Sequence, residues 1–185
     1  MQSAKCKMQN AKCKMQSAKC KMRNVKCEMV KIDRDLLDNT SARAKASPRR
    51  RMNHNFHLQY TDTMQRMLNA MEPLSYIQPH KHEDPDKREV FFALRGRIVV
   101  IEFDEQGNIT GHILLDPLRG NYGAEIPERT YHTIIALDPD SVAYEVKDGP
   151  YTPIDDKNFA NWAPREGEAA VMEYLTGLLD RTIGH

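Results

Sequence analysis

Long apolar runs are missing from this 185-residue sequence, and no segment approaches the roughly 20 apolar residues that span a bilayer. Cysteine is confined to four positions within residues 1–28, and none of the four forms a Cys-x-x-Cys pair, so neither a zinc ribbon nor a disulfide framework is expected. The N-terminus also lacks the apolar stretch of a secretory signal. We therefore expect a cytoplasmic protein that has no membrane partner.

Charge is distributed unevenly along the chain, although the formal net charge is only +1. Residues 1–52 carry fifteen Lys/Arg against four Asp/Glu, a net of +11, whereas the remainder carries twelve against twenty-two, a net of −10. A basic extension can bind nucleic acid or a membrane surface. No aromatic residue lies among the lysines of residues 1–28 to stack on bases, so a solvated tail without a nucleic-acid partner is favoured.

Residues 1–28 form a low-complexity repeat with a period of seven, and all four cysteines lie inside it. Methionine and alanine or valine recur at the spacing of coiled-coil core positions. Alanine packs poorly there, and four short heptads barely reach a stable helical length. We interpret this segment as a disordered or poorly anchored extension, and we expect the natural product to begin near Met29.

The sequence after the repeat predicts an all-β domain between two helices. A short helix is expected over residues 33–46, ended by Ser47-Pro48, within an N-terminal helix and basic linker spanning 29–52. Arg49, Arg50 and Arg51 in this linker either grip phosphate or carboxylate or form a solvated run. An amphipathic helix is expected over 166–181, within a C-terminal helical segment spanning 166–185.

Residues 53–165 show short apolar runs separated by turn signals, which indicate a sandwich or barrel. Residues 88–94 and 97–103 flank Arg95-Gly96 and are predicted to form a hairpin. The other expected strands cover residues 64–71, 76–82, 109–115, 122–126, 130–137 and 142–147.

The most informative pattern is a set of metal-ligand residue types at strand spacing. Side chains two apart in a strand share one face, so His80 and His82 point the same way. Together with Glu89 and His132 they make a plausible ligand set for one divalent transition metal: Fe, Mn, Ni, Zn or Co. Glu83, Asp84 or Asp86 could supply the carboxylate ligand in place of Glu89. The alternative to a metal site is a barrel that binds no metal and uses its histidines only to hydrogen-bond a ligand.

These residues resemble the two motifs of the cupin family. His80-x-His82, Glu89 and Gly96 are similar to the first motif, and Pro127 followed by His132 is similar to the second. The resemblance implies a double-stranded β-helix (jelly-roll) barrel, metal ligation by His80, His82, Glu89 and His132, and a homodimer.

More narrowly, the chain from Arg49 to Leu179 resembles the WbuC family of cupin-fold metalloproteins. The supporting stretches include residues 47–51, 64–67, 79–82, 125–127, 131–133 and 145–151. That family is associated with bacterial surface-polysaccharide gene clusters, so the resemblance implies a carbohydrate context.

The predicted function is metal-dependent isomerase, epimerase or lyase chemistry on a small sugar or sugar-nucleotide derivative. The alternative is a non-catalytic module that binds a sugar, since the sequence contains no acid/base pair with diagnostic spacing. The candidate substrate-binding residues are His57, Arg66, Tyr76, Gln78, Lys147 and Tyr151.

Overall fold

The computed structural model describes residues 29–150 and 158–184. The chain divides into two units, Met1–Ile32 and Asp33–His185. In the first unit only residues 29–32 are described, and they form no helix or strand. The predictions made for residues 1–28 and for Tyr151 lie outside the described residues.

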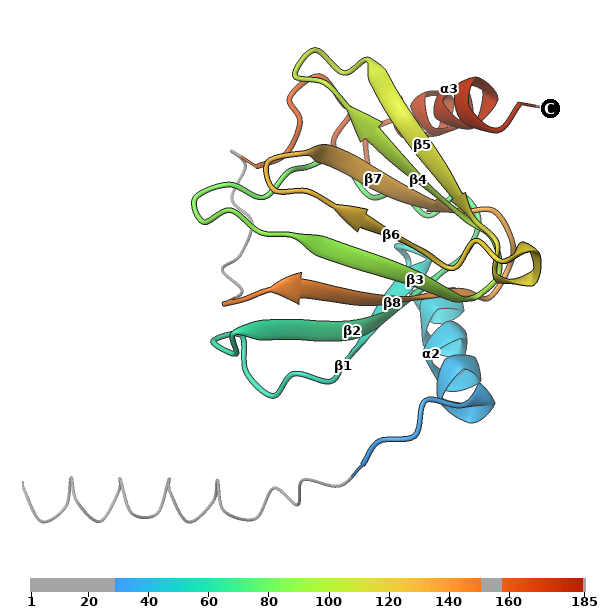
Figure 1. The fold of residues 1–185 in the computed structure, drawn as a ribbon. Coiled ribbons are helices and arrows are strands. Elements are labelled where there is room, and N and C mark those ends of the chain that lie inside the picture. Colours follow the sequence, from blue (N-terminus) through green and yellow to red (C-terminus); the bar gives the residue numbers. More distant parts are fainter. Residues whose placement is uncertain (1–28, 151–157, 185) are drawn as a thin grey trace, which may run out of the picture. The chain divides into compact units, whose positions relative to one another are not determined.

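Two antiparallel sheets build the second unit (Figure 1). The larger sheet has the order β1-β2-β8-β3-β6, and the smaller has the order β5-β4-β7. The strands are β1 (Arg51–Asn55), β2 (Met64–Met71), β3 (Glu89–Arg95), β4 (Ile98–Phe103), β5 (Ile109–Leu115), β6 (Gly123–Ile126), β7 (Tyr131–Ala136) and β8 (Ser141–Asp148). A short 3-10 turn, η1 (Pro117–Arg119), precedes β6. This two-sheet jelly roll confirms the predicted fold class.

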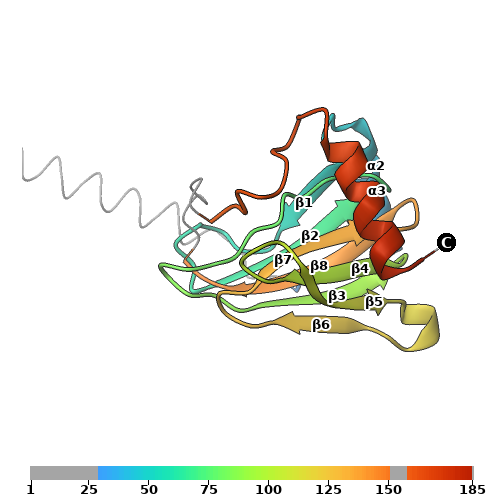
Figure 2. The same cartoon turned by 90° about the horizontal axis from the view of Figure 1, so that it is seen from above.

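The core lies between the two sheets and beneath two helices. Ile98 and Val100 of β4 point into the space between the sheets, whereas Val99 and Ile101 point to the opposite face. There they meet Leu175 of α3 (Val171–Thr182), which covers the smaller sheet (Figure 2). Alternation with a period of two therefore buries both faces of this strand.

The N-terminal helix forms where the sequence predicts it. α2 (Arg34–Ala46) begins after Asp33, whose carboxylate accepts a hydrogen bond from the Leu36 amide at 3.2 Å. Its buried residues Leu37 and Ala44 pack in one cluster with Leu68 of β2, and the helix also contacts β1 and β8.

The C-terminal helix begins at Val171, five residues later than predicted. Gly167 has a φ of +93°, a left-handed conformation that a right-handed helix does not contain. Among the described residues, no helix has the length and apolar character needed to cross a bilayer.

The predicted hairpin around Gly96 is wrong. β3 pairs with β6 and β8 in the larger sheet, while β4 pairs with β5 and β7 in the smaller one. The flanking arginines bond to the β7–β8 connection instead: Arg95 donates to the Asp140 carbonyl at 2.7 Å, and Arg97 pairs with Asp138 at 2.7 Å. The turn therefore transfers the chain from one sheet to the other.

The predicted strand over residues 76–82 is also absent. Only His80 forms isolated bridges, to His132 and Phe159, and the preceding Pro79 has no amide hydrogen to extend a ladder. The structure also contains a strand that was not predicted, β1, which precedes the first expected strand at residues 64–71.

Gly96→Ala tests the transfer between the sheets. Gly96 has a φ of +73°, and an added Cβ would collide with the Ser141 side chain, which is bonded to the Asp138 carbonyl. We expect the free energy of unfolding to fall by about 2–4 kcal/mol, from left-handed strain plus the collision.

Gly120→Ala is the matched control, because Gly120 has a φ of +85° and its Cβ would meet nothing within 4 Å. Backbone strain alone should lower the free energy of unfolding of this variant by about 1–2 kcal/mol. Urea denaturation measures both variants, and equal losses would contradict the packing described at Gly96.

Candidate metal centre

Three separate parts of the chain bring the predicted ligands together. His80 and His82 lie in the extended segment before β3, Glu89 is the first residue of β3, and His132 is the second residue of β7. Backbone hydrogen bonds between His80 and His132, at 3.1 and 2.9 Å, hold this segment against β7. The larger sheet contributes Glu89 and the smaller sheet contributes His132, so the cluster lies between the two layers.

The four side chains form a tight, buried cluster. Their donor atoms all lie within 4.8 Å of one another. One oxygen of Glu89 lies 2.8 Å from the Nε2 atom of His82, and the other lies 2.8 Å from the Nε2 atom of His132. Glu89 and His132 are each 2% exposed. This arrangement can hold a metal ion.

The acidic residues that rivalled Glu89 lie outside this cluster. Glu83 pairs with Lys81 at 3.3 Å, and Asp86 pairs with Arg129 at 2.8 Å. Asp84 is exposed to solvent. Among the described residues, Glu89 is therefore the carboxylate that the fold places with the three imidazoles.

Backbone carbonyls orient two of the imidazoles. The Nδ1 atom of His80 lies 3.1 Å from the Gln78 carbonyl, and the Nδ1 atom of His132 lies 2.9 Å from the Thr130 carbonyl. Because an Nδ1–H that donates to a carbonyl fixes the tautomer, the Nε2 atom of each ring remains as the donor for a metal.

Burial and neighbouring charges set the protonation of the cluster. Burial opposes the ionisation of Glu89, but Lys147 and the two imidazoles outweigh it and hold the pKa of this carboxyl well below its usual range. Burial holds the pKa of His80 well below the ordinary histidine value, helped by the nearby His132. Burial also acts against the charge on His132, but the bond to Glu89 and its negative charge raise the pKa of that ring.

A line of polar side chains extends from the cluster across the interior. The Nζ atom of Lys147 lies 3.2 Å from Glu89 and 3.3 Å from Glu145, and the Lys147 side chain is only 10% exposed. Glu145 in turn accepts a hydrogen bond from the Asn69 side-chain amide. Glu145 and Asn69 were not predicted as site residues. The alternation of β8 is a signal for Glu145, because it shares a strand face with Lys147.

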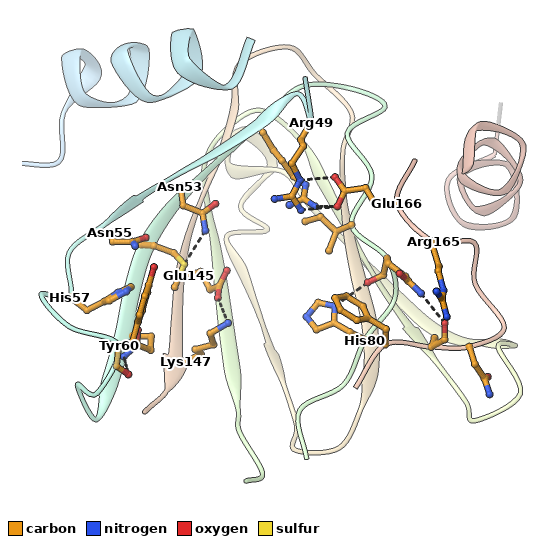
Figure 3. Close-up of a pocket in the computed structure, with 18 residues that line it drawn as sticks. Arg49, Asn53, Asn55, His57, Tyr60, His80, Glu145, Lys147, Arg165 and Glu166 are labelled. Atoms are coloured by element: carbon orange, nitrogen blue, oxygen red, sulfur yellow. Dashed lines mark hydrogen bonds and ion pairs between the residues drawn. The ribbon is translucent and has the colours of Figure 1, made fainter. Parts of the chain in front are cut away.

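A cavity of about 620 Å³ borders the cluster at His80 (Figure 3). A second cavity of about 110 Å³ is bounded by His80, Glu89 and His132, and the two cavities share Glu145 and Lys147 in their walls. Segment 158–166 forms one wall of the larger cavity. It is joined to residues 78–81 by hydrogen bonds, including Ala160 to Pro79 at 2.9 Å.

Three of the predicted substrate-binding residues, His57, Gln78 and Lys147, line this larger cavity. Arg66 does not, because its neighbours Gln65 and Met67 occupy the inward face of β2 and Arg66 therefore points to the other face. Tyr76 also lies elsewhere.

The Tyr76 ring is buried in the core beneath α3, and its hydroxyl donates to the Pro164 carbonyl at 2.7 Å. Among the described residues, the cavity wall also contains polar residues outside the predicted substrate-binding set: Arg49, Arg51, Asn53, Asn55, Tyr60, Gln65, Glu145, Asn161, Arg165 and Glu166. Arg51, Asn53 and Asn55 alternate along β1, which is the signal that could have found them.

The two antiparallel sheets and the His/Glu cluster between them define a jelly-roll barrel with a candidate metal site. A family model described as a domain of unknown function, DUF6016, matches residues 32–115. No curated protein matches the chain in sequence.

Solved structures similar to this chain include cupin superfamily proteins. KdgF from Halomonas sp. is 18% identical, with 60% of this chain and 86% of that chain covered and a TM-score of 0.44. A cupin superfamily protein from Desulfitobacterium hafniense is 13% identical, with 53% and 76% covered and a TM-score of 0.42. The capsular polysaccharide assembling protein CapF from Staphylococcus aureus is 22% identical, with 50% of this chain but only 24% of that chain covered and a TM-score of 0.43.

The raised pKa of His132 predicts that metal affinity depends on pH. A proton on this ring must leave before the ring can bind a metal, so affinity for Co²⁺ should fall as the pH is lowered through the His132 pKa, starting above the ordinary histidine value of about 6.5. Competition with a chromophoric chelator at several pH values measures this. An affinity that stays constant from about pH 8 to about pH 6 would contradict the protonation states given above.

Proposed function

We propose that the protein is a metal-binding cupin that acts on a small sugar or sugar-nucleotide derivative. His80, His82, Glu89 and His132 hold one divalent transition metal, which is Fe, Mn, Ni, Zn or Co. The observation that carries the proposal is the set of four donor atoms within 4.8 Å of one another, from four residues of which His80 lines a cavity of about 620 Å³.

The donor set fits such a metal. Imidazole and carboxylate ligands without thiolate suit these ions and disfavour a closed structural zinc site. The buried Nε2 atom of His82 lies 2.8 Å from Glu89, yet it finds no hydrogen bond of good geometry among the described residues. A buried polar atom of this kind is costly unless a further partner satisfies it, and a bound ion is such a partner.

The cavity wall supplies the groups that isomerase, epimerase or lyase chemistry needs. When bound, the metal would act as a Lewis acid that polarises a carbonyl or hydroxyl oxygen of the ligand. Glu145, held by Asn69 and Lys147, presents a carboxylate to both cavities for proton transfer. His57 and Gln78 offer hydrogen bonds to sugar hydroxyls.

A non-catalytic sugar-binding module is the second candidate. The observation that favours it is the number of amide side chains in the cavity wall, which suit hydroxyl recognition but do not move protons: Asn53, Asn55, Gln65, Gln78 and Asn161. In this case the metal would orient the ligand, and Glu145 would only shape the cavity.

The setting of this function is part of the same proposal. The WbuC-like sequence stretches suggest bacterial surface-polysaccharide metabolism in the cytoplasm. A homodimer is supported by the short edge strand β6 and by Phe92 and Leu94 of the neighbouring β3, which are 45% and 40% exposed. Pairing would cover such an edge and its apolar side chains.

Metal analysis of purified His80→Ala tests the ligand set. Loss of one imidazole from the cluster should weaken metal binding by more than about tenfold, since even residues that only orient ligands contribute about that much. His112→Ala is the matched control, because His112 is exposed on β5 and lies outside the cluster. Wild-type protein without stoichiometric metal, or equal metal contents in the two variants, would contradict the proposal.

Turnover separates the two candidate functions. A catalytic cupin should convert a sugar or sugar-nucleotide substrate, and a chelator should abolish the conversion. Glu145→Gln should then retain the metal but lose turnover by about a hundredfold or more, as removal of a general acid or base does. Ligand binding by calorimetry without turnover, unchanged in Glu145→Gln, would favour the binding module.

A further inference from the structure

The described residues of the larger cavity's wall carry more cations than carboxylates, although the domain around the cavity is acidic. From Asn53 onward the chain carries twelve Lys/Arg against twenty-two Asp/Glu. Among the described residues that line the cavity, the charged side chains are Arg49, Arg51, Lys147 and Arg165 against Glu145 and Glu166. A wall with more cations than carboxylates, in a domain of opposite sign, concentrates anions locally.

The excess positive charge lies at one part of this wall. Lys147 is paired with Glu89 and Glu145 in the interior. The other charged groups that the described part of the chain places in this wall are three guanidiniums and the Glu166 carboxylate. Arg165 directly precedes Glu166 in the chain, is exposed, and forms no ion pair with another described residue in the structure.

The arginines already grip a carboxylate here. The Nε and Nη2 atoms of Arg49 donate to the two oxygens of Glu166 at 2.6 and 2.7 Å, a bidentate fork. Arg51 adds a third bond at 2.9 Å. The Arg51 side chain is 17% exposed and is fixed by a bond to the Tyr76 carbonyl at 3.2 Å, so its position is set before any ligand arrives.

The ion pairs between Glu166 and the arginines are open to solvent. Its side chain is 39% exposed, and the Arg49 side chain is 57% exposed, so solvent reaches both partners. Because water and salt screen the attraction between exposed charges, another anion can exchange with Glu166 at these guanidiniums. Glu166 therefore has the position and the chemistry of an internal carboxylate that competes for the guanidiniums.

We propose that Arg49, Arg51 and Arg165 bind the anionic group of the ligand and that Glu166 competes with it for these side chains. The ligand is an anionic, hydroxyl-rich small molecule, such as a sugar acid or a sugar phosphate. This inference rests on the proposed function, since it names the substrate class of the same cavity. Arginine suits it because the planar fork matches both carboxylate and phosphate oxygens. A cavity of about 620 Å³ has room for a molecule of that size.

Calorimetric titration of the full-length protein with three probes that share one sugar ring tests the proposal. These are galactose, galacturonate and galactose 1-phosphate. The two anions should bind at least about tenfold more tightly than galactose, which is the effect of one good charge-assisted bond. The order of the two anions distinguishes a carboxylate ligand from a phosphate ligand.

Three substitutions assign the effect to the guanidinium cluster. Arg165→Gln and Arg49→Gln should each weaken binding of the anionic probes by about tenfold and leave the affinity for galactose unchanged. Glu166→Gln should strengthen binding of the anionic probes, since it removes the competing carboxylate but keeps the side-chain volume. Arg43→Gln is the matched control, because this exposed arginine of α2 is absent from the cavity wall and its loss changes the net charge equally.

The proposal is overturned if galactose binds as tightly as the anions, if none of the probes binds at millimolar concentrations, or if both cavity arginine variants behave like Arg43→Gln. Weaker anion binding in Glu166→Gln overturns the competitor role. Metal content measured on the same samples separates this inference from the proposed function. Intact metal and galactose binding without anion preference would defeat only the inference, whereas anion preference without metal would defeat only the metal site.

Discussion

The interior of this protein depends on one buried carboxylate held between two imidazoles. Glu89 is 2% exposed, and its two oxygens lie 2.8 Å from His82 and from His132. A charge removed from water is tolerated only when it is fully partnered, so the three segments that carry these residues must meet at this point. The contact thereby ties β3 of one sheet to β7 of the other and fixes the loop that contains His82.

The same carboxylate organises the charges on the cavity side. Lys147 bonds to Glu89 and also to Glu145, and Glu145 bonds to Asn69, so positive and negative groups alternate across the barrel. Farther along the described cavity wall, guanidinium groups outnumber carboxylates. The candidate metal cluster thus borders the cavity at His80, Glu145 lies in the cavity wall, and the described arginines form the part of the wall proposed to bind an anionic group.

The sequence predicted the parts of the fold that depend on local pattern. Alternation and turn signals identified most strands, and Asp33 marked the start of the first helix. The assignment of strands to sheets was not local: Arg95-Gly96 looks like a hairpin turn, but the partners of Arg95 and Arg97 lie in the distant 138–140 segment. The candidate metal cluster could be predicted from the sequence because its residue types and their spacing are unusual. Arg165 and Glu166 were missed because only tertiary folding brings segment 158–166 beside β1.

Anomalous X-ray diffraction from crystals of the purified protein, collected at the absorption edges of the candidate metals, tests the central claim most directly. The account predicts a single strong anomalous peak between the side chains of His80, His82, Glu89 and His132. Crystals of protein supplied with these metals that show well-ordered side chains, a Glu89–His132 hydrogen bond and no anomalous peak would contradict it.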